Sequence, residues 1–229
     1  MNILRWFNQH DQYFRLLVFL FSLLPAVILF GDWCGLGLGI NPFAALIERT
    51  GFWAMFFLIL TLSITPLRRW LTYFHKLCRL RFGKRLADWN FLIRARRMLG
   101  LYSFFYLCWH MGIYWHLELG WQWSEFLYDL SDRLFVGVGL AAWVLSLLLA
   151  LTSPTGVRRR MGRQWRKLHR VMYLLCVLAV IHVLWEAKLG DRLQWLYAFW
   201  VFVFLTHRIM VHYITSWVRK DDTGLEAER

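Results

Sequence analysis

Six apolar stretches of roughly 20 residues dominate the sequence, and this is the length that a helix needs to cross about 30 Å of hydrocarbon. They predict membrane-spanning helices over residues 14–31, 51–67, 98–118, 134–152, 171–187 and 194–214. The second helix is expected to end at Pro66, because proline lacks the N–H group that a continuing helix needs. The whole chain, residues 1–229, is therefore predicted to form a single domain. Its fold class is an all-α integral membrane protein with a six-helix transmembrane bundle.

The composition agrees with this prediction. Hydrophobic residues make up 59% of the chain and aromatic residues 19%, which is too apolar for a soluble domain of 229 residues. The four cysteines lie far apart and form neither a disulfide framework nor a zinc motif. They are Cys34, Cys78, Cys108 and Cys176.

Basic residues gather in two of the connections between the apolar stretches. Residues 68–97 hold ten arginines and lysines against one acid, Asp88, and residues 158–170 hold seven with no acid. By the positive-inside rule both connections face the cytoplasm, and both termini then do so as well. The net charge of +13 is thus explained by topology and by contact with anionic lipid headgroups rather than by nucleic-acid binding.

Histidines inside the predicted spans are candidate functional residues, because an ionisable group in a membrane is costly. His110 lies 13 residues after Arg97, and His182 lies 12 residues after Arg170. At about 1.5 Å per residue, both imidazoles are roughly 18–20 Å from the cytoplasmic edge. Two histidines at one depth, on helices of like direction, favour axial ligation of one b-type heme iron. Two unrelated histidines, each satisfied within the bundle, are the alternative.

His169 is harder to assign. It stands 13 residues before His182, a spacing of about 19.5 Å that suits two stacked hemes, but helical rotation leaves the side chains about 140° apart. A second heme would also need a partner at the mouth of the third span, where Arg96 and Arg97 stand. We therefore predict one heme, keep two as the alternative, and place His169 at the cytoplasmic mouth. His207, in the sixth span, is a spare ligand.

Two further patterns have two interpretations each. Arginines at the mouths of the third and fifth spans orient the helices, or else bind a phosphate-bearing cofactor on whose ring Trp165 would stack. These arginines are Arg94, Arg96, Arg97, Arg163, Arg166 and Arg170. Small residues in the fourth span either allow close helix packing or admit a flat ligand. They are Gly137, Gly139, Ala141 and Ala142.

Several segments together resemble the MsrQ (YedZ) family, the heme-binding membrane subunits of bacterial periplasmic methionine sulfoxide reductase systems. This family is part of the ferric-reductase-like transmembrane superfamily. The segments are residues 64–67, 92–101, 117–120 and 168–182, together with His110, and the resemblance covers about residues 10–215.

The resemblance implies a multi-pass electron-transfer subunit of the bacterial inner membrane that has no substrate chemistry of its own. Electrons from a cytoplasmic flavin reductase or from quinol would pass through heme b to a periplasmic molybdopterin-containing catalytic subunit. That subunit reduces methionine sulfoxide in oxidised proteins, and the two subunits form a heterodimer. The family's three histidines fall on His110, His169 and His182.

The resemblance also implies an FMN on the cytoplasmic side, which suits the mouths that hold Arg96, Arg97, Trp165 and Arg166. Two-heme proteins of the superfamily carry a second histidine in the third span. Here the positions 14 residues to either side of His110 are Arg96 and Ser124. A stand-alone ferric or quinone reductase is the first alternative function. A cofactor-free transporter or membrane scaffold, whose histidines form a proton path, is the second.

Overall fold

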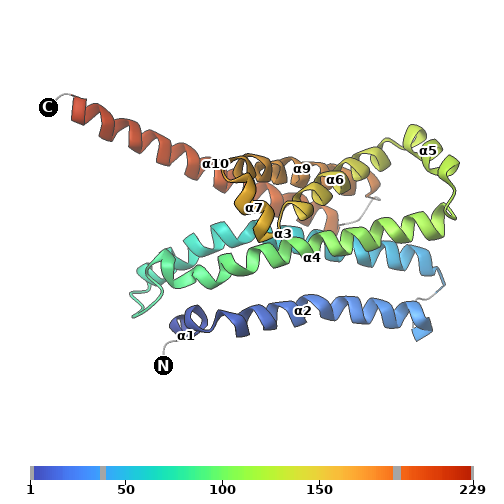
Figure 1. Ribbon diagram of the computed structural model, residues 1–229, viewed down its shortest axis with the longest axis horizontal. Helices are drawn as coiled ribbons and strands as arrows, with labels where there is room; N and C mark the ends of the chain where they lie inside the picture. The colour runs from blue at the N-terminus through green and yellow to red at the C-terminus, as the bar shows by residue number, and fades with distance from the viewer. Residues whose placement is uncertain (1–2, 37–39, 188–191, 228–229) are drawn as a thin grey trace.

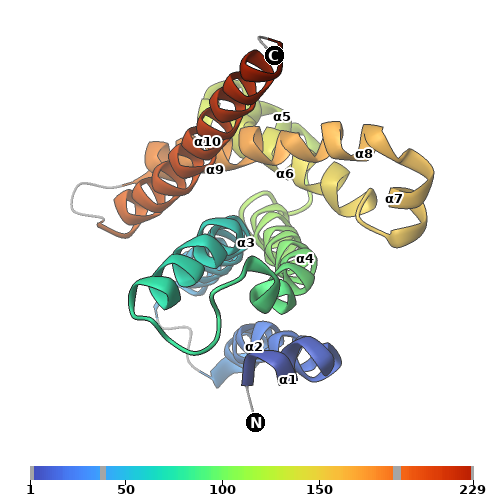
Figure 2. The ribbon, with the colours of Figure 1, turned by 90° about the vertical axis from the view of Figure 1, so that its left-hand side faces the viewer.

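The computed structural model describes residues 3–36, 40–187 and 192–227, and every regular element within these ranges is helical. Figure 2 shows the long helices in three layers. The layers are α2 (Asp11–Gly31); α3 (Pro42–Leu77) with α4 (Asn90–Ile113); and α6 (Leu134–Leu151) with α9 (Met172–Glu186) and α10 (Arg192–Ala227). The shorter elements are α1 (Ile3–Gln9), η1 (Asp32–Leu36), η2 (Leu86–Trp89), η3 (Tyr114–Glu118), α5 (Trp123–Asp132), α7 (Thr155–Met161), α8 (Arg163–Leu168) and η4 (His169–Val171).

Among the described residues, five helical segments are long and apolar enough to cross a membrane, so the chain is a multi-pass membrane protein. They are Asp11–Gly35, Pro42–Leu77, Leu134–Leu151, Arg163–Glu186 and Arg192–Ile214. The remaining predicted span, residues 98–118, corresponds to α4, which begins eight residues earlier at Asn90 and includes three arginines. Helix α4 contacts α2, α3 and α6. Of its three arginines, Arg96 is half-buried, whereas Arg94 and Arg97 are exposed.

The prediction that the second helix ends at Pro66 is wrong, because α3 continues through this residue to Leu77. Proline removes the N–H group that would have bonded the carbonyl of Leu62, four residues earlier. Arg208 of α10 replaces that donor, with Nη2 at 2.8 Å from the Leu62 oxygen. Its other terminal nitrogen donates to the Tyr173 hydroxyl at 3.2 Å. A tertiary contact thus repairs the helix, and the local sequence does not reveal it.

Helix α4 is tied to its neighbours by buried hydroxyl groups. The Tyr106 hydroxyl donates to the carbonyl of Ser22 in α2 at 2.7 Å, and Tyr106 is 0% exposed. The Ser103 hydroxyl donates to the carbonyl of Ala54 in α3 at 2.8 Å. In an apolar medium such bonds provide partners for polar groups that cannot bond to water. They also fix the rotation of α4 about its axis.

Two apolar clusters form the core of the part of the chain that the structure describes. The first joins α2, α3 and α4 through residues such as Leu29, Leu46, Phe57, Leu99 and Tyr106. The second joins α3, α6, α9 and α10 through residues such as Leu58, Leu62, Ala142, Leu175 and Phe204. Because α3 contributes to both, it holds the two halves of the bundle together. A site that takes residues from α4 and α9 therefore lies between the halves.

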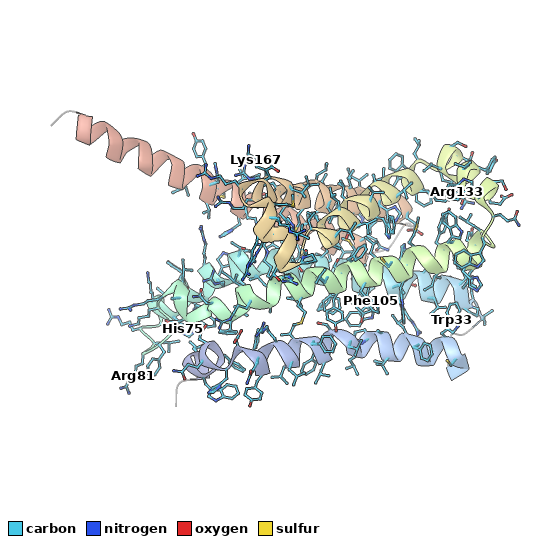
Figure 3. All side chains as sticks on the ribbon, viewed as in Figure 1. Trp33, His75, Arg81, Phe105, Arg133 and Lys167 are labelled. Carbon is cyan, nitrogen blue, oxygen red and sulfur yellow. The ribbon has the colours of Figure 1, made fainter. Side chains whose placement is uncertain are left out.

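The two ends of the bundle differ in charge. The connections over residues 78–89 and 152–171 lie toward the same end, as do α1 and the end of α10 (Figure 1). We call this the basic end. His75 and Arg81 lie there, whereas Trp33 and Arg133 lie at the opposite end (Figure 3), where α5 also lies (Figure 1). We call the opposite end the α5 end.

Candidate functional site

The imidazoles of His110 on α4 and His182 on α9 lie next to each other between the two halves of the bundle. Their ring centroids are 6.5 Å apart, and the ring planes are nearly perpendicular, at 88°. Both side chains are half-buried. The structure therefore brings together the two histidines whose depths the sequence matched.

Each ring is held by a backbone carbonyl of a helix other than its own. Nδ1 of His110 is 3.0 Å from the oxygen of Ile47 in α3, and Nδ1 of His182 is 2.8 Å from the oxygen of Phe135 in α6. A carbonyl oxygen only accepts, so the hydrogen resides on Nδ1 of both rings. This tautomer leaves the lone pair of each Nε2 available to a metal.

This donor set fits a heme iron. A metal bound by two imidazole nitrogens at about 2 Å each puts the ring centroids about 6 Å apart, close to the 6.5 Å observed. No group of three or more His, Cys, Asp or Glu side chains with metal-site spacing occurs in the described part of the chain. The pair offers two protein ligands, and a six-coordinate heme iron takes its other four from the porphyrin.

His169 stands at a separate level, closer to the basic end. Its Nε2 is 3.2 Å from the Thr152 hydroxyl, and its ring lies against Trp165 with centroids 4.0 Å apart and planes tilted by 32°. The Trp165 indole donates Nε1–H to the Thr152 carbonyl at 2.9 Å. Arg96 of α4 lies within electrostatic range of His169. At this level α4 thus contributes an arginine, and η4, which leads into α9, contributes a histidine.

The arginines that the sequence grouped into a phosphate site do not share one environment. Arg94 donates to the backbone oxygen of Asn8 at 3.0 Å and pairs with Asp11 at 3.3 Å, so it fastens α1 and α2 to α4. Arg97 and Arg166 are exposed, whereas Arg96 is half-buried.

Trp165, the residue expected to stack on a flavin ring, is already in contact with side chains of this chain. The His169 ring lies against its indole, and the Arg158 guanidinium lies 5.9 Å from the ring centroid. These contacts do not fit a stacked flavin. FMN stays a prediction of the family resemblance.

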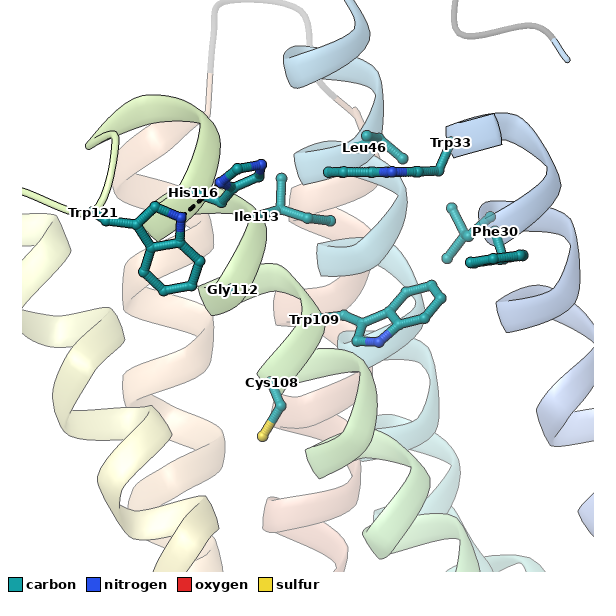
Figure 4. Close-up of a pocket in the computed structure, with 10 residues that line it drawn as sticks. Phe30, Trp33, Leu46, Cys108, Trp109, Gly112, Ile113, His116 and Trp121 are labelled. Carbon is teal, nitrogen blue, oxygen red and sulfur yellow. Dashed lines mark hydrogen bonds between the residues drawn. The ribbon is translucent and has the colours of Figure 1, made fainter. Parts of the chain in front are cut away.

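The other histidines of interest lie away from the pair. His116 accepts the Trp121 indole N–H at 2.8 Å, beside a cavity of about 320 Å³ at the α5 end (Figure 4). His207, the predicted spare ligand, packs edge-on against Trp70 at 5.6 Å. Trp70 is 19 residues along α3 from Gly51, which contacts His110. His207 is therefore roughly 28 Å from the level of the pair.

Sequence reasoning missed the acceptors that orient the two rings. Ile47 and Phe135 act through their backbone oxygens, which every residue type possesses, so no side-chain pattern could reveal them. Thr50 was missed as well. It is 0% exposed, donates to the Leu46 carbonyl at 2.7 Å, and lies 3.4 Å from Nδ1 of His110.

Comparison with known proteins places this arrangement in context. The family model of the ferric reductase like transmembrane component matches residues 50–180. The protein-methionine-sulfoxide reductase heme-binding subunit MsrQ of Xanthomonas euvesicatoria pv. vesicatoria (strain 85-10) is 40% identical over 172 residues, which are 75% of this chain and 72% of that protein. The subunit of the same name from Herminiimonas arsenicoxydans is 40% identical over 149 residues, 65% of this chain and 61% of that protein.

Proposed function

The chain belongs to the ferric-reductase-like transmembrane family and, within it, to the MsrQ family, and on that premise we propose that it is a heme-binding electron-transfer subunit of a methionine sulfoxide reductase system. The observation that carries the proposal is the His110–His182 pair, with its centroids 6.5 Å apart. Bound heme b would supply reversible one-electron transfer at this place.

The chain's own residues would provide ligation, orientation and a dry environment. His110 and His182 would hold the heme iron through Nε2, because their Nδ1 atoms are held by α3 and α6. A carbonyl acceptor on Nδ1–H also makes each imidazole a stronger donor toward the metal. These roles support an electron-transfer subunit of the system.

We propose six membrane crossings, which are the five helical segments given above and α4. Helix α4 has 24 residues, about 36 Å at 1.5 Å per residue, which is enough to span the hydrocarbon. Six crossings require both termini on one side, and α1 and the end of α10 both lie toward the basic end (Figure 1). By the positive-inside rule this end faces the cytoplasm of a bacterial cell whose inner membrane holds the protein.

The position of the pair suggests where electrons enter and leave. His110 is three residues before the end of α4, and His182 is four residues before the end of α9. Both helices end toward the α5 end, so the heme would lie near the periplasmic face. A periplasmic molybdopterin-containing catalytic subunit is the proposed acceptor. A cytoplasmic flavin reductase or quinol is the proposed donor.

The test is to purify the full chain from its membrane and measure its absorption spectrum, heme content and low-spin signal together. We expect a Soret band and one heme per chain by pyridine hemochrome. We also expect an electron paramagnetic resonance (EPR) spectrum typical of a low-spin heme iron with two imidazole ligands. A protein without a Soret band would instead be a cofactor-free transporter or scaffold. Turnover of ferric chelates or quinone by the isolated chain, without a molybdenum subunit, would identify a stand-alone reductase.

A further inference from the structure

The two candidate ligands rest on the same backbone arrangement in two different helices. His110 bonds the carbonyl of Ile47, and Gly51 follows four residues later in α3. His182 bonds the carbonyl of Phe135, and Gly139 follows four residues later in α6. Residues four apart lie one above the other on a single face of a helix. Each imidazole therefore packs against a glycine while it reaches the carbonyl one turn away.

The glycines are in contact with the rings themselves. A Cβ atom at Gly139 would lie 2.8 Å from both Cε1 and Nδ1 of His182. A Cβ atom at Gly51 would lie 3.3 Å from the same two atoms of His110. Unbonded carbon atoms prefer separations of about 3.5–4.0 Å. Any side chain at position 139 must move the ring, whereas one at position 51 requires a shift of a few tenths of an ångström.

We propose that these two carbonyl–glycine pairs, Ile47 with Gly51 and Phe135 with Gly139, are positioning elements for the ligand histidines. The glycine leaves room for the ring to lie on the helix. The carbonyl, which has a second lone pair beyond its helical bond, fixes the hydrogen on Nδ1 and so directs the Nε2 lone pair away from the helix. The proposal rests on the proposed function only for the identity of the metal that Nε2 would bind.

The two pairs differ in how much they tolerate a methyl group. Gly139→Ala would push the His182 ring off its 2.8 Å bond to Phe135, and loss of such an outer partner weakens metal binding about 10–100-fold. Gly51→Ala should act in the same direction but less strongly, because its contact at 3.3 Å is looser. Glycine-to-alanine changes favour helix formation, so a loss of heme would not come from a weaker helix.

Two other glycines provide matched controls. A Cβ atom at Gly137, two residues away on α6, would meet only Leu130 at an ordinary 3.5 Å. A Cβ atom at Gly112, two residues from His110 on α4, would meet nothing within 4 Å. Gly137→Ala adds the same methyl group to the helix that holds Gly139, and Gly112→Ala adds it to the helix that holds His110, and neither touches a ligand ring.

The experiment measures the tautomer of the ligand histidines in the heme-free chain and the retention of heme in the heme-loaded chain. In the heme-free chain, nitrogen NMR shifts should show the hydrogen on Nδ1 of His182, and Gly139→Ala should move it to Nε2 or mix the two forms. In the heme-loaded chain, Gly139→Ala should transfer heme to apomyoglobin about tenfold faster or more and shift the low-spin EPR signal. Gly51→Ala should show a smaller shift, and both controls should match the wild type.

The proposal is overturned if Gly139→Ala keeps the wild-type tautomer and rate of heme transfer, or if Gly137→Ala is equally damaging. Should Gly139→Ala fail to fold, Gly51→Ala decides: an unchanged EPR signal and heme transfer rate would refute the positioning role. A wild-type chain without heme would contradict the proposed function, while the tautomer measurement would still test the positioning.

Discussion

Residues of α4 meet a residue of α9 at one level and a residue of η4, the short helix that leads into α9, at another, and the two levels are built differently. At the level near the α5 end, His110 faces His182 with centroids 6.5 Å apart. At the level near the basic end, Arg96 lies within electrostatic range of His169. Arg96 and His110 are 14 residues apart, and His169 and His182 are 13 residues apart. Both spacings correspond to about 20 Å along a helix.

The difference between the two levels shows that a single side chain determines whether a level can bind a metal. A guanidinium stays charged and has no lone pair to offer, so Arg96 cannot act as a metal ligand. The supporting contacts differ too. The pair near the α5 end uses Nδ1 for its carbonyls, whereas His169 engages Nε2 with the Thr152 hydroxyl at 3.2 Å. The two levels thus offer one pair of facing histidines, which lies at the level near the α5 end.

Removal of a ligand gives the largest expected effect. His182→Ala or His110→Ala should abolish the low-spin heme spectrum, because a single imidazole cannot keep the iron six-coordinate between the helices. His169→Ala should retain the wild-type heme content, and so should His207→Ala. Pyridine hemochrome and EPR on the purified variants check this. Full low-spin heme in His182→Ala would refute the ligand assignment, and its loss in His169→Ala would refute the separation of levels.

The reverse experiment rebuilds the missing ligand. Arg96→His should give the level near the basic end two histidines and raise heme from one to two per chain when heme is supplied in excess. The shorter side chain leaves space where the guanidinium stood, and the fixed positive charge is gone. Heme per chain and a second midpoint potential in a redox titration measure the outcome.

Arg96→Gln is the control for this gain, because it removes the charge without adding a ligand. It should bind as much heme as the wild type. An equal gain of heme in Arg96→Gln would mean that charge alone, not ligation, excludes heme from this level. No gain in Arg96→His, with the original heme intact, would mean that the backbone there is unsuited to a metal site.

Much of this comparison could be predicted from the sequence. The depth match between His110 and His182 needed only helical rise and loop charge, and Arg96 stood at the right position to block a second site. The course of α3 past Pro66 was not predictable, because the donor that rescues the Leu62 carbonyl is Arg208, 146 residues away. Carbonyl acceptors and the orientation of Gly139 likewise depend on how α6 and α9 pack, which periodicity alone does not reveal.

A moderate effect is expected at the proline in α3. Arg208→Met should destabilise the protein by about 1.5–3 kcal/mol, because removal of the charged donor leaves the buried Leu62 carbonyl without a hydrogen-bond partner. Pro66→Ala restores the backbone N–H group, so the same substitution should cost much less in that background. A double-mutant cycle of thermal unfolding in detergent measures the coupling. Equal costs in both backgrounds would show that Arg208 stabilises the bundle by another route.

The smallest effect is expected at Trp165, and it sharpens the contrast between the levels. Trp165→Phe keeps an aromatic ring against His169 but removes the indole donor to the Thr152 carbonyl, 2.9 Å away. The loss should be about 0.5–1.5 kcal/mol in unfolding free energy, with heme content and the EPR signal unchanged. A shift of the heme spectrum in this variant would instead couple the His169 level to the iron, because nothing else in the substitution reaches the His110–His182 pair.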